Sequence, residues 1–495
     1  MTLSPAVSAI GGGRLRFSFA RGGSGAALAV ASGFAWSVLF VAIGVGAGLE
    51  AYGDGALFSY AVAADSAWAF HWHNIPGRFF TYLFAHLPAE TYGALTGDAH
   101  GAIVLYGTLF FVAPLLGLIA TFAADRSEGR IFFVSACAAT AVLCPLVFGF
   151  PTETWMAHAL FWPTLALCHA ARPGASALVL VVFALLALLF THEGALLFAA
   201  AIVVGLIPRG LRDPAFRRAG LAASLALALW ILVHATAKPD PYFAGVFSRA
   251  ALHVFDPEIL RADLVLLFAG TLTVYGIAFA LASSLARGSA PWVAASLVLL
   301  GLGVYWLRFD HALHAEDRYY LRTLLLVLDP AAGLLAAGRV LLNEGRTFWP
   351  LHGLRKLAPT RFARAAGPAA CGALLLVSLV HAVETAKFVA GWERYRTALR
   401  TLTAGPASDP RLGDPRFVSA ERLAAGLDRL AWSSTTPFLS VLLAPGYTPA
   451  RLVIDPRANY FWLPCPTARA HVAARGGIPV TSRQLIETFS CQRRP

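Results

Sequence analysis

Carboxylates, imidazoles and arginines stand at the ends of long apolar stretches, where such groups could do chemistry at a membrane surface. The densest set lies between residues 50 and 100, the longest segment in the first half of the chain that is too polar for lipid. Ionisable groups near membrane depth are costly, and they usually face a cavity or one another. The candidates for such a site are Glu50, Asp54, Asp65, Arg78, Glu153, His192, Glu193, His311, His314, Glu316, Arg318 and Arg322.

The composition shows that these groups belong to an integral membrane protein. Of the 495 residues, 58% are hydrophobic and 13% are charged, whereas roughly 25% of the residues of a soluble domain are charged. The net charge of +12 could suggest nucleic-acid binding, but the arginines lie in short loops between apolar stretches, a pattern that sets membrane topology. No cleavage site of the A-x-A kind follows the first apolar stretch, which is therefore expected to remain as an anchor.

Apolar stretches of about the length that crosses a bilayer recur along the chain. They predict a mainly α-helical bundle of about eleven transmembrane spans. The expected spans are 26–49, 101–124, 131–150, 155–171, 175–190, 194–208, 219–237, 263–286, 291–307, 321–342 and 367–390.

Loops rich in arginine alternate with loops that carry most of the acids. Because positive loops stay in the cytoplasm, residues 1–25 are expected to form a cytoplasmic tail, and the loop 50–100 is expected to face outward. The bundle 26–390 would then be followed by an extracytoplasmic C-terminal domain, 391–495. The predicted location is the bacterial inner (cytoplasmic) membrane, with the C-terminal domain in the periplasm.

Both outer regions have predicted structure of their own. Segments 55–70 and 76–95 have helical apolar spacing and are expected to lie in the membrane interface. In the C-terminal region, helices are expected at 392–402 and 419–430 and short strands at 438–443 and 452–454, which would make a small α+β domain. Its two cysteines could pair in an oxidising compartment; they are Cys465 and Cys491.

Several candidates also have a purely structural explanation. Asp54 lies in Tyr52-Gly53-Asp54-Gly55, which is ordinary turn chemistry. Glu153 and Glu193 stand where helices are expected to begin, and a carboxylate in the first turn interacts favourably with the helix dipole. The two histidines of the later loop could be surface residues. The case for a site is that all these groups are expected on one side of the membrane.

Group transfer from a lipid-linked donor suits this pattern. The reaction needs a carboxylate as general base for the acceptor hydroxyl, and Asp54, Glu50 or Asp65 could serve. It also needs a cation for the donor phosphate; Arg318, Arg322 and Arg78 are the candidates because the guanidinium binds phosphate in a fork. The remaining pocket candidates are Glu153, His192, Glu193, His311, His314 and Glu316.

Two short stretches resemble the GT-C class of polytopic glycosyltransferases, which use polyprenyl-phosphate sugars. Tyr52-Gly53-Asp54-Gly55 follows the first span, where that class holds a catalytic acid. His314-Ala315-Glu316-Asp317-Arg318-Tyr319-Tyr320-Leu321 stands before a later span, where members of the class often carry a His/Glu-Arg-Tyr stretch. The chain departs from the class in having no adjacent acidic pair after the first span, which leaves the base open between three carboxylates.

The resemblance implies an enzyme that moves a sugar from a polyprenyl-phosphate donor to an envelope glycan, lipid or protein. The expected partners are therefore the bilayer, this donor and this acceptor, with no nucleic acid. No Cys/His metal-binding spacing occurs, and the sequence names no cofactor, although it leaves a divalent metal open. A multi-span transporter or flippase and a non-catalytic envelope assembly protein are the alternatives.

Overall fold

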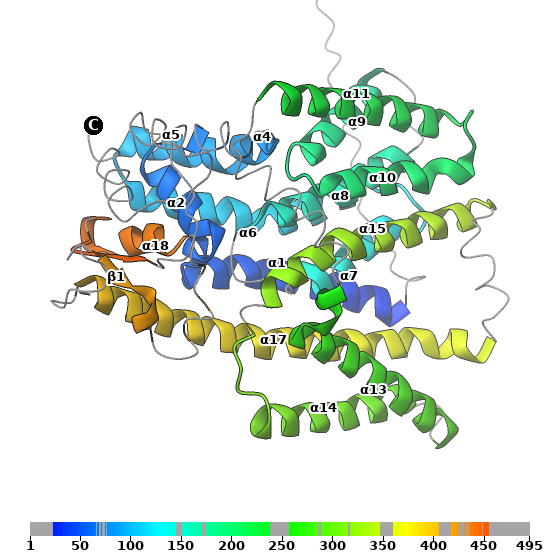
Figure 1. Ribbon diagram of the computed structural model, residues 1–495. Coiled ribbons are helices and arrows are strands. Elements are labelled where there is room, and N and C mark those ends of the chain that lie inside the picture. Colours follow the sequence, from blue (N-terminus) through cyan, green and yellow to red (C-terminus); the bar gives the residue numbers. More distant parts are fainter. Residues whose placement is uncertain are drawn as a thin grey trace, which may run out of the picture.

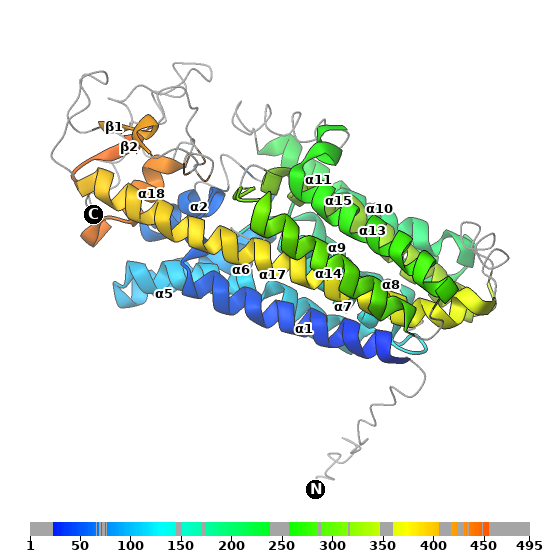
Figure 2. The same ribbon diagram turned by 90° about the horizontal axis from the view of Figure 1, so that it is seen from below.

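A computed structural model gives the fold of most of the chain (Figure 1). It describes residues 23–65, 67–68, 71, 75, 77–144, 151–170, 175–237, 257–285, 289–314, 317–346, 360–404, 417–423, 427, 430, 432, 435–447 and 449–454, without the side chains of 284–285, 317–322, 360–366 and 417. The long helices run roughly side by side, so the molecule has two ends at which the loops gather (Figures 1 and 2).

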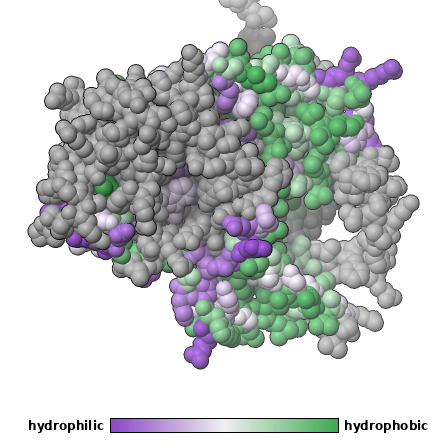
Figure 3. All heavy atoms as spheres, viewed as in Figure 1, coloured by the Kyte–Doolittle hydropathy of each residue, from purple (hydrophilic) through white to green (hydrophobic). Residues whose placement is uncertain are grey.

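Within the described residues, seven helices are long and apolar enough to cross a membrane, so the protein is a multi-pass membrane protein. They are α1 (Gly23–Gly46), α6 (Ala99–Ala124), α11 (Pro214–Thr236), α13 (Asp263–Leu285), α14 (Ala290–Arg308), α15 (Asp317–Asn343) and α17 (Thr360–Ala404). Large apolar side chains remain exposed on their outer faces, for example Leu300 at 68% and Leu281 at 66%. Figure 3 shows such residues gathered over the part of the molecule where α11, α13 and α14 lie. These faces are suited to lipid contact.

Four shorter helices pack among the long ones. They are α7 (Ile131–Leu143), α8 (Glu153–His169), α9 (Ala175–Leu189) and α10 (Ala195–Leu206), the last continued by η5 (Ile207–Arg209). Helix α8 is buried over nearly its whole length, and α6 approaches it closely at Gly117, where a Cβ would lie 2.6 Å from the Ala159 carbonyl oxygen. Every predicted span overlaps a helix. Among the described helices, however, seven are long and apolar enough to cross a membrane. The count of about eleven crossings therefore stays a prediction.

The segment between α1 and α6 is helical, as predicted, but its first helix is not interfacial. After η2 (Leu49–Ala51), helix α2 (Asp54–Ala63) buries every residue from Gly55 to Val62. It begins at Gly53, whose backbone angles (φ 59°, ψ −132°) are accessible essentially only to glycine. The second predicted helix is built from α4 (Phe79–Thr81), η3 (Tyr82–His86) and α5 (Leu87–Thr96). Helix α5 exposes apolar side chains such as Leu95 at 82%, as an interfacial helix would.

The C-terminal region continues directly from the bundle, because α17 runs unbroken to Ala404. The strand predicted at 452–454 is present as β2 (Leu452–Ile454) and pairs in parallel with β1 (Phe417–Ser419). The strand predicted at 438–443 was wrong: this segment is helix α18 (Thr436–Leu442). The helix predicted from residue 419 was also wrong over 419–422, where η8 (Ala420–Arg422) follows β1. Residues 455–495, with Cys465 and Cys491, lie outside the described residues.

These C-terminal elements lie at the same end of the molecule as α2 and α5 (Figures 1 and 2). Phe438 and Val441 of α18 share an apolar cluster with Leu57 and Phe58 of α2. Trp392 of α17 donates a hydrogen bond of 3.0 Å to the Ala47 carbonyl at the end of α1. The last long helix therefore fixes the end of the first, and with it the start of the polar segment that follows.

A polar network that the sequence analysis did not single out joins α7, α8 and α15 inside the bundle. The His158 Nδ1 lies 2.8 Å from Asp329 Oδ2, and the Trp162 indole N–H donates to Asp329 Oδ1 at 3.0 Å. Thr140 Oγ1 lies 2.9 Å from His158 Nε2. Both ionisable side chains are almost completely buried, and a buried charge is stable only when it is paired and hydrogen-bonded. The network therefore fixes the register of the three helices.

Replacing one partner of this pair should destabilise the protein more than replacing both. The Asp329→Leu variant leaves His158 without its acceptor and should lose about 3–5 kcal/mol, because a lone buried polar group remains. The double variant Asp329→Leu, His158→Leu should recover part of that loss. Thermal unfolding in detergent of the two single variants and the double variant measures the coupling; additive losses would contradict a coupled pair.

Candidate functional site

A guanidinium held between two carboxylates forms the centre of the candidate site. Arg78 Nη1 donates to Glu153 Oε1 at 2.9 Å, and Arg78 Nη2 donates to Glu193 Oε2 at 3.0 Å. The Arg78 Nε also donates to Glu193, at 3.2 Å and 3.3 Å to its two oxygens. All three side chains are mostly buried. The tertiary structure thus joins three residues that the sequence placed in three separate loops.

Local backbone contacts bring the three residues together. Glu153 is the first residue of α8, and Glu193 lies in the turn between α9 and α10. The start of α4 packs on this turn: the Phe80 N–H donates to the Phe190 carbonyl at 2.9 Å, and Thr81 Oγ1 donates to the Thr191 carbonyl at 3.2 Å. His192 belongs to the same turn, where its Nδ1 accepts from the Gly194 N–H at 2.9 Å.

The two carboxylates are held ionised by this arrangement. Burial raises the pKa of Glu193, but the nearby positive charge of Arg78 and its hydrogen bonds outweigh burial and bring the pKa down to about 2. Burial opposes ionisation of Glu153 as well, and Arg78 again lowers the net pKa. One positive charge faces two negative ones, and all three guanidinium nitrogens are engaged. A donor phosphate, the ligand predicted for Arg78, would have to displace a carboxylate here.

Glu50 is in a different state from these paired carboxylates. It is 7% exposed, and its Oε2 has no hydrogen-bond partner among the described residues. Burial raises the pKa of Glu50 to about 7, although its own backbone N–H and the charge of Arg396 act in the opposite direction. Helix α6 packs closely against Glu50 at Gly107, where a Cβ would lie 2.4 Å from the Glu50 Cβ. A carboxylate with a pKa near neutrality is suited to accept and release a proton.

Asp54 lies next to Glu50, and Asp65 does not. The charges of Glu153, Asp54 and Glu50 all act on the buried Tyr106 hydroxyl of α6, so the three carboxylates lie in one region around α6. Asp65 follows the other end of α2, roughly 15 Å along a helix of ten residues. It is exposed, and its charge acts on Tyr82 and Glu90 instead.

Two buried histidines line the inner side of the same region and were not among the predicted site residues. The His71 Nε2 lies 3.4 Å from the His86 Nε2. Burial lowers the pKa of His86 to about 4, and burial together with the charge of His86 lowers the pKa of His71. Both imidazoles are thus neutral near pH 7 and can relay a hydrogen bond.

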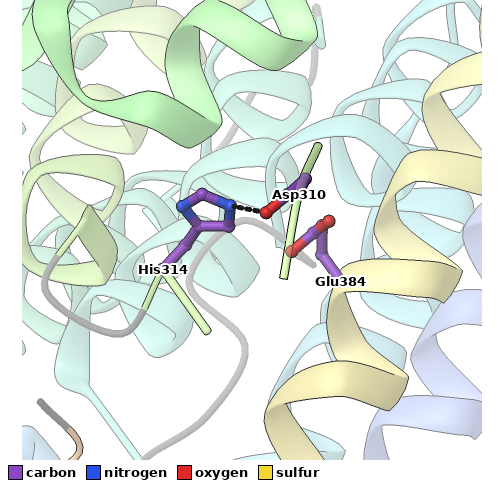
Figure 4. A group of neighbouring side chains, drawn as sticks. All are labelled: Asp310, His314 and Glu384. Atoms are coloured by element: carbon purple, nitrogen blue, oxygen red, sulfur yellow. Dashed lines mark hydrogen bonds and ion pairs between the residues drawn. The ribbon is translucent and has the colours of Figure 1, made fainter. Parts of the chain in front are cut away.

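A second group of polar side chains lies where the loop before α15 meets α17. His314 Nε2 lies 2.9 Å from Asp310 Oδ1, and Glu384 of α17 points toward them (Figure 4). Asp310, His314 and Glu384 offer ligand atoms within 4.8 Å of one another, as a metal site would. However, the Lys387 ammonium lies 3.0 Å from Asp310 and 3.2 Å from Glu384. This ammonium supplies the positive charge, and a metal ion would have to displace it.

The other predicted residues of this loop are only partly described. His311 is exposed. Glu316 lies outside the described residues, and for Arg318 and Arg322 the structure gives the helical backbone of α15 but no side chain. Leu326, one turn after Arg322, lies within 2.6 Å of the position of a Cβ on Gly194. Helix α15 therefore packs near the turn that carries His192 and Glu193, about one turn beyond Arg322.

An apolar groove of about 130 Å³ lies beside the segment that follows Arg78, with Phe80 among its lining residues. It runs between the α4–η3 segment, α6 and α8 at the outer surface of the bundle. Its lining residues are Phe80, Phe84, Ala113, Leu116, Gly117, Ala120, Met156, Ala159, Leu160 and Pro163. Such a groove is suited to a hydrocarbon chain.

The fold and this site define a polytopic helical membrane protein with a buried cluster of carboxylates at one end. Comparisons with models of protein families, with curated proteins and with solved structures find no match.

The burial of Glu50 predicts a pH-dependent gain in stability for the Glu50→Gln variant. An acid whose pKa rises from 4.5 to about 7 on folding destabilises the folded state increasingly as the pH passes from 4.5 to 7. Glu50→Gln should therefore be more stable than the wild type at pH 8, by up to roughly 3 kcal/mol, and not at pH 4. Thermal unfolding at both pH values measures this, with Asp65→Asn as the exposed control; an equal shift at both pH values would refute it.

Removing Arg78 should have the opposite dependence on pH. Glu193 contributes stability above its unfolded pKa of 4.5, and this contribution disappears as the pH falls toward 2. Arg78→Gln should lose about 3–5 kcal/mol at pH 7, because two buried carboxylates are left without their cation, and much less near pH 3. Arg78→Lys, which keeps the charge and loses the fork, should lie between. A loss that does not depend on pH would show that Arg78 acts through packing.

Proposed function

We propose that the protein is a glycosyltransferase of the GT-C type, which moves a sugar from a polyprenyl phosphate to an acceptor of the cell envelope. The observation that carries the proposal is the position of Glu50 and Asp54, two acids near one another. In the same region, the segment that follows Arg78 lines an apolar groove. A base for a hydroxyl and a channel for a lipid tail are the two parts that this reaction requires.

The chemistry of the transfer follows from the carboxylates. The acceptor hydroxyl oxygen attacks C1 of the sugar, and the bond from C1 to the phosphate oxygen breaks, so that polyprenyl phosphate leaves with the electron pair. The hydroxyl proton passes to the base. Glu50, with a pKa of about 7 and an oxygen that bonds no described residue, is better suited to this role than Glu153 or Glu193, which Arg78 keeps ionised. Asp54 is the second candidate, and it is the one that the GT-C resemblance favours.

Arg78 would position the site instead of binding the donor. Its guanidinium is already shared between two carboxylates, and this leaves the donor phosphate to Arg318 or Arg322. Both belong to the first turns of α15, a helix that contacts the turn of Glu193 through Leu326. The negative charge that remains around Arg78 could also attract a divalent cation, which would then bind the phosphate.

The alternation of charged loops supports an orientation with this site outside the cytoplasm. The carboxylate cluster and the C-terminal elements lie at one end of the bundle, and the Arg126 and Arg209 loops at the other (Figure 1). Under the positive-inside rule, the arginine end faces the cytoplasm of a bacterial inner membrane. About eleven crossings would then place residues 391–495 in the periplasm.

Transport is the second candidate function, and the pair of His158 and Asp329 is the observation that favours it. Ionisable residues buried inside a bundle often mark an ion or proton path. Here Thr140 and Trp162 also bond the pair, which is what a structural role requires. The network therefore favours a fixed helix contact over a path.

Substitution of the acids separates these functions. In membranes supplied with a panel of radiolabelled polyprenyl-phosphate sugars, Glu50→Gln or Asp54→Asn should lower sugar transfer by about 100-fold or more. Asp65→Asn, remote from the cluster, should transfer normally. If neutralising Glu50 and Asp54, each in turn, leaves transfer and membrane insertion intact, the enzyme proposal fails.

The groove makes a separate prediction about the donor. Leu160→Trp should obstruct the groove and raise the KM for a long-chain polyprenyl donor by about tenfold, with little effect on a short-chain analogue. Leu300→Trp, on an exposed face of α14, is the matched control. An equal effect on both donors would mean that the tail does not lie in this groove.

A further inference from the structure

A second cavity, at the end of the bundle opposite the carboxylate cluster, is basic. It has a volume of about 300 Å³, which is at the lower end of small-molecule sites. Its lining residues are Arg126, Ser127, Phe132, Ala166, His169, Ala170, Arg209, Val340 and Glu344. They come from the α6–α7 loop and from the ends of α8, η5 and α15. Two arginines face one carboxylate, so the lining has a net positive charge.

The cavity wall contains buried polar groups without a hydrogen-bond partner among the residues that the structure describes. His169 is 5% exposed, and neither of its ring nitrogens has a hydrogen-bond partner among the described residues. The same holds for the buried Nε of Arg209, although its Nη2 is bonded to Glu344 at 2.6 Å. A buried polar group without a hydrogen bond destabilises the folded state, so a ligand that supplied acceptors would be stabilising.

The structure around the cavity holds these groups in place. The His169 ring packs on Phe132 with centroids 5.0 Å apart, and a Cβ on Gly205 of α10 would lie 3.7 Å from its Nε2. Glu344 accepts from Arg209, and Arg346 bonds the Arg209 carbonyl at 2.8 Å. Arg126 has no bond to another described residue. The side chains of Arg126, His169 and Arg209 therefore line one space.

We infer that this cavity binds a phosphate group, either of an anionic phospholipid or of a free phosphate compound. Phosphate offers several acceptor oxygens and negative charge, which match two guanidinium groups and an imidazole N–H. Basic pockets between helices at a membrane face are known sites for lipid headgroups. The inference is independent of the proposed sugar transfer, because it uses residues at the other end of the molecule.

Binding to the delipidated, full-length protein in detergent tests the inference. Native mass spectrometry would follow titrations with dioleoylphosphatidylglycerol, with dioleoylglycerol as the lipid that lacks phosphate, and with inorganic phosphate. We expect one bound phosphatidylglycerol, or one bound phosphate, and no saturable binding of dioleoylglycerol. Saturation by the phospholipid alone identifies a lipid site, and saturation by inorganic phosphate as well identifies a site for free phosphate compounds.

Variants tie the binding to this cavity. Arg126→Gln and His169→Phe should each raise the Kd by about tenfold; phenylalanine preserves the ring contact with Phe132. Arg308→Gln removes the same charge from the exposed end of α14 and should bind normally. The inference is overturned if neither phosphate probe saturates one site, or if the two cavity variants bind as tightly as Arg308→Gln. Elution of each variant as a monodisperse peak confirms folding. If Arg126→Gln aggregates, His169→Phe still tests the cavity, because it leaves the surface charge unaltered.

Discussion

Compensation of buried charge is the constraint on which the end of the protein around Arg78 depends. Arg78 can be mostly buried only because Glu153 and Glu193 neutralise it, and the two glutamates can be buried only because Arg78 is there. The three residues come from three segments, so the ion pairs join the first loop to α8 and to the α9–α10 turn. The backbone bonds of Phe80 and Thr81 to the same turn reinforce this junction. Phe80 and Phe84 of the same segment line one side of the apolar groove.

Carboxylates of one chemical type acquire different properties in this setting. Glu193 is ionised because a guanidinium lies 3.0 Å away, and Glu50 has a pKa of about 7 because its backbone N–H and Arg396 offset burial only in part. Environments that push the pKa values of neighbouring acids apart are typical of sites that divide structural and chemical roles. Asp310 belongs to the structural kind. Burial raises its pKa, but the hydrogen bond from Lys387 and the charge of His314 outweigh burial and bring the pKa below its usual value.

The two ends of the bundle differ in the sign of their charge. Acids dominate around Arg78, and arginines dominate around the cavity of His169. Long helices separate them, so ligands at the two ends would not compete for one space. Helix α17, with 45 residues, spans this distance, and it holds the end of α1 through Trp392 and Arg396. The position of Glu50 immediately after α1 is therefore set partly from the far end of the chain.

The sequence by itself determined that this is a multi-pass helical membrane protein, because runs such as 101–124 are apolar enough to require lipid or a buried interior. It also indicated Glu50, Asp54, Arg78, Glu153 and Glu193 as polar groups in need of partners. It could not decide which groups meet, because pairing between loops far apart in the chain has no local signal. Nor did it predict that α2 is buried or that 436–442 is helical, since both short apolar segments take their environment from tertiary packing. Only the tertiary structure paired His158 with Asp329, separated Asp65 from the other acids and buried His169 away from any hydrogen-bond partner in the described part of the chain, since each outcome depends on how the helices pack.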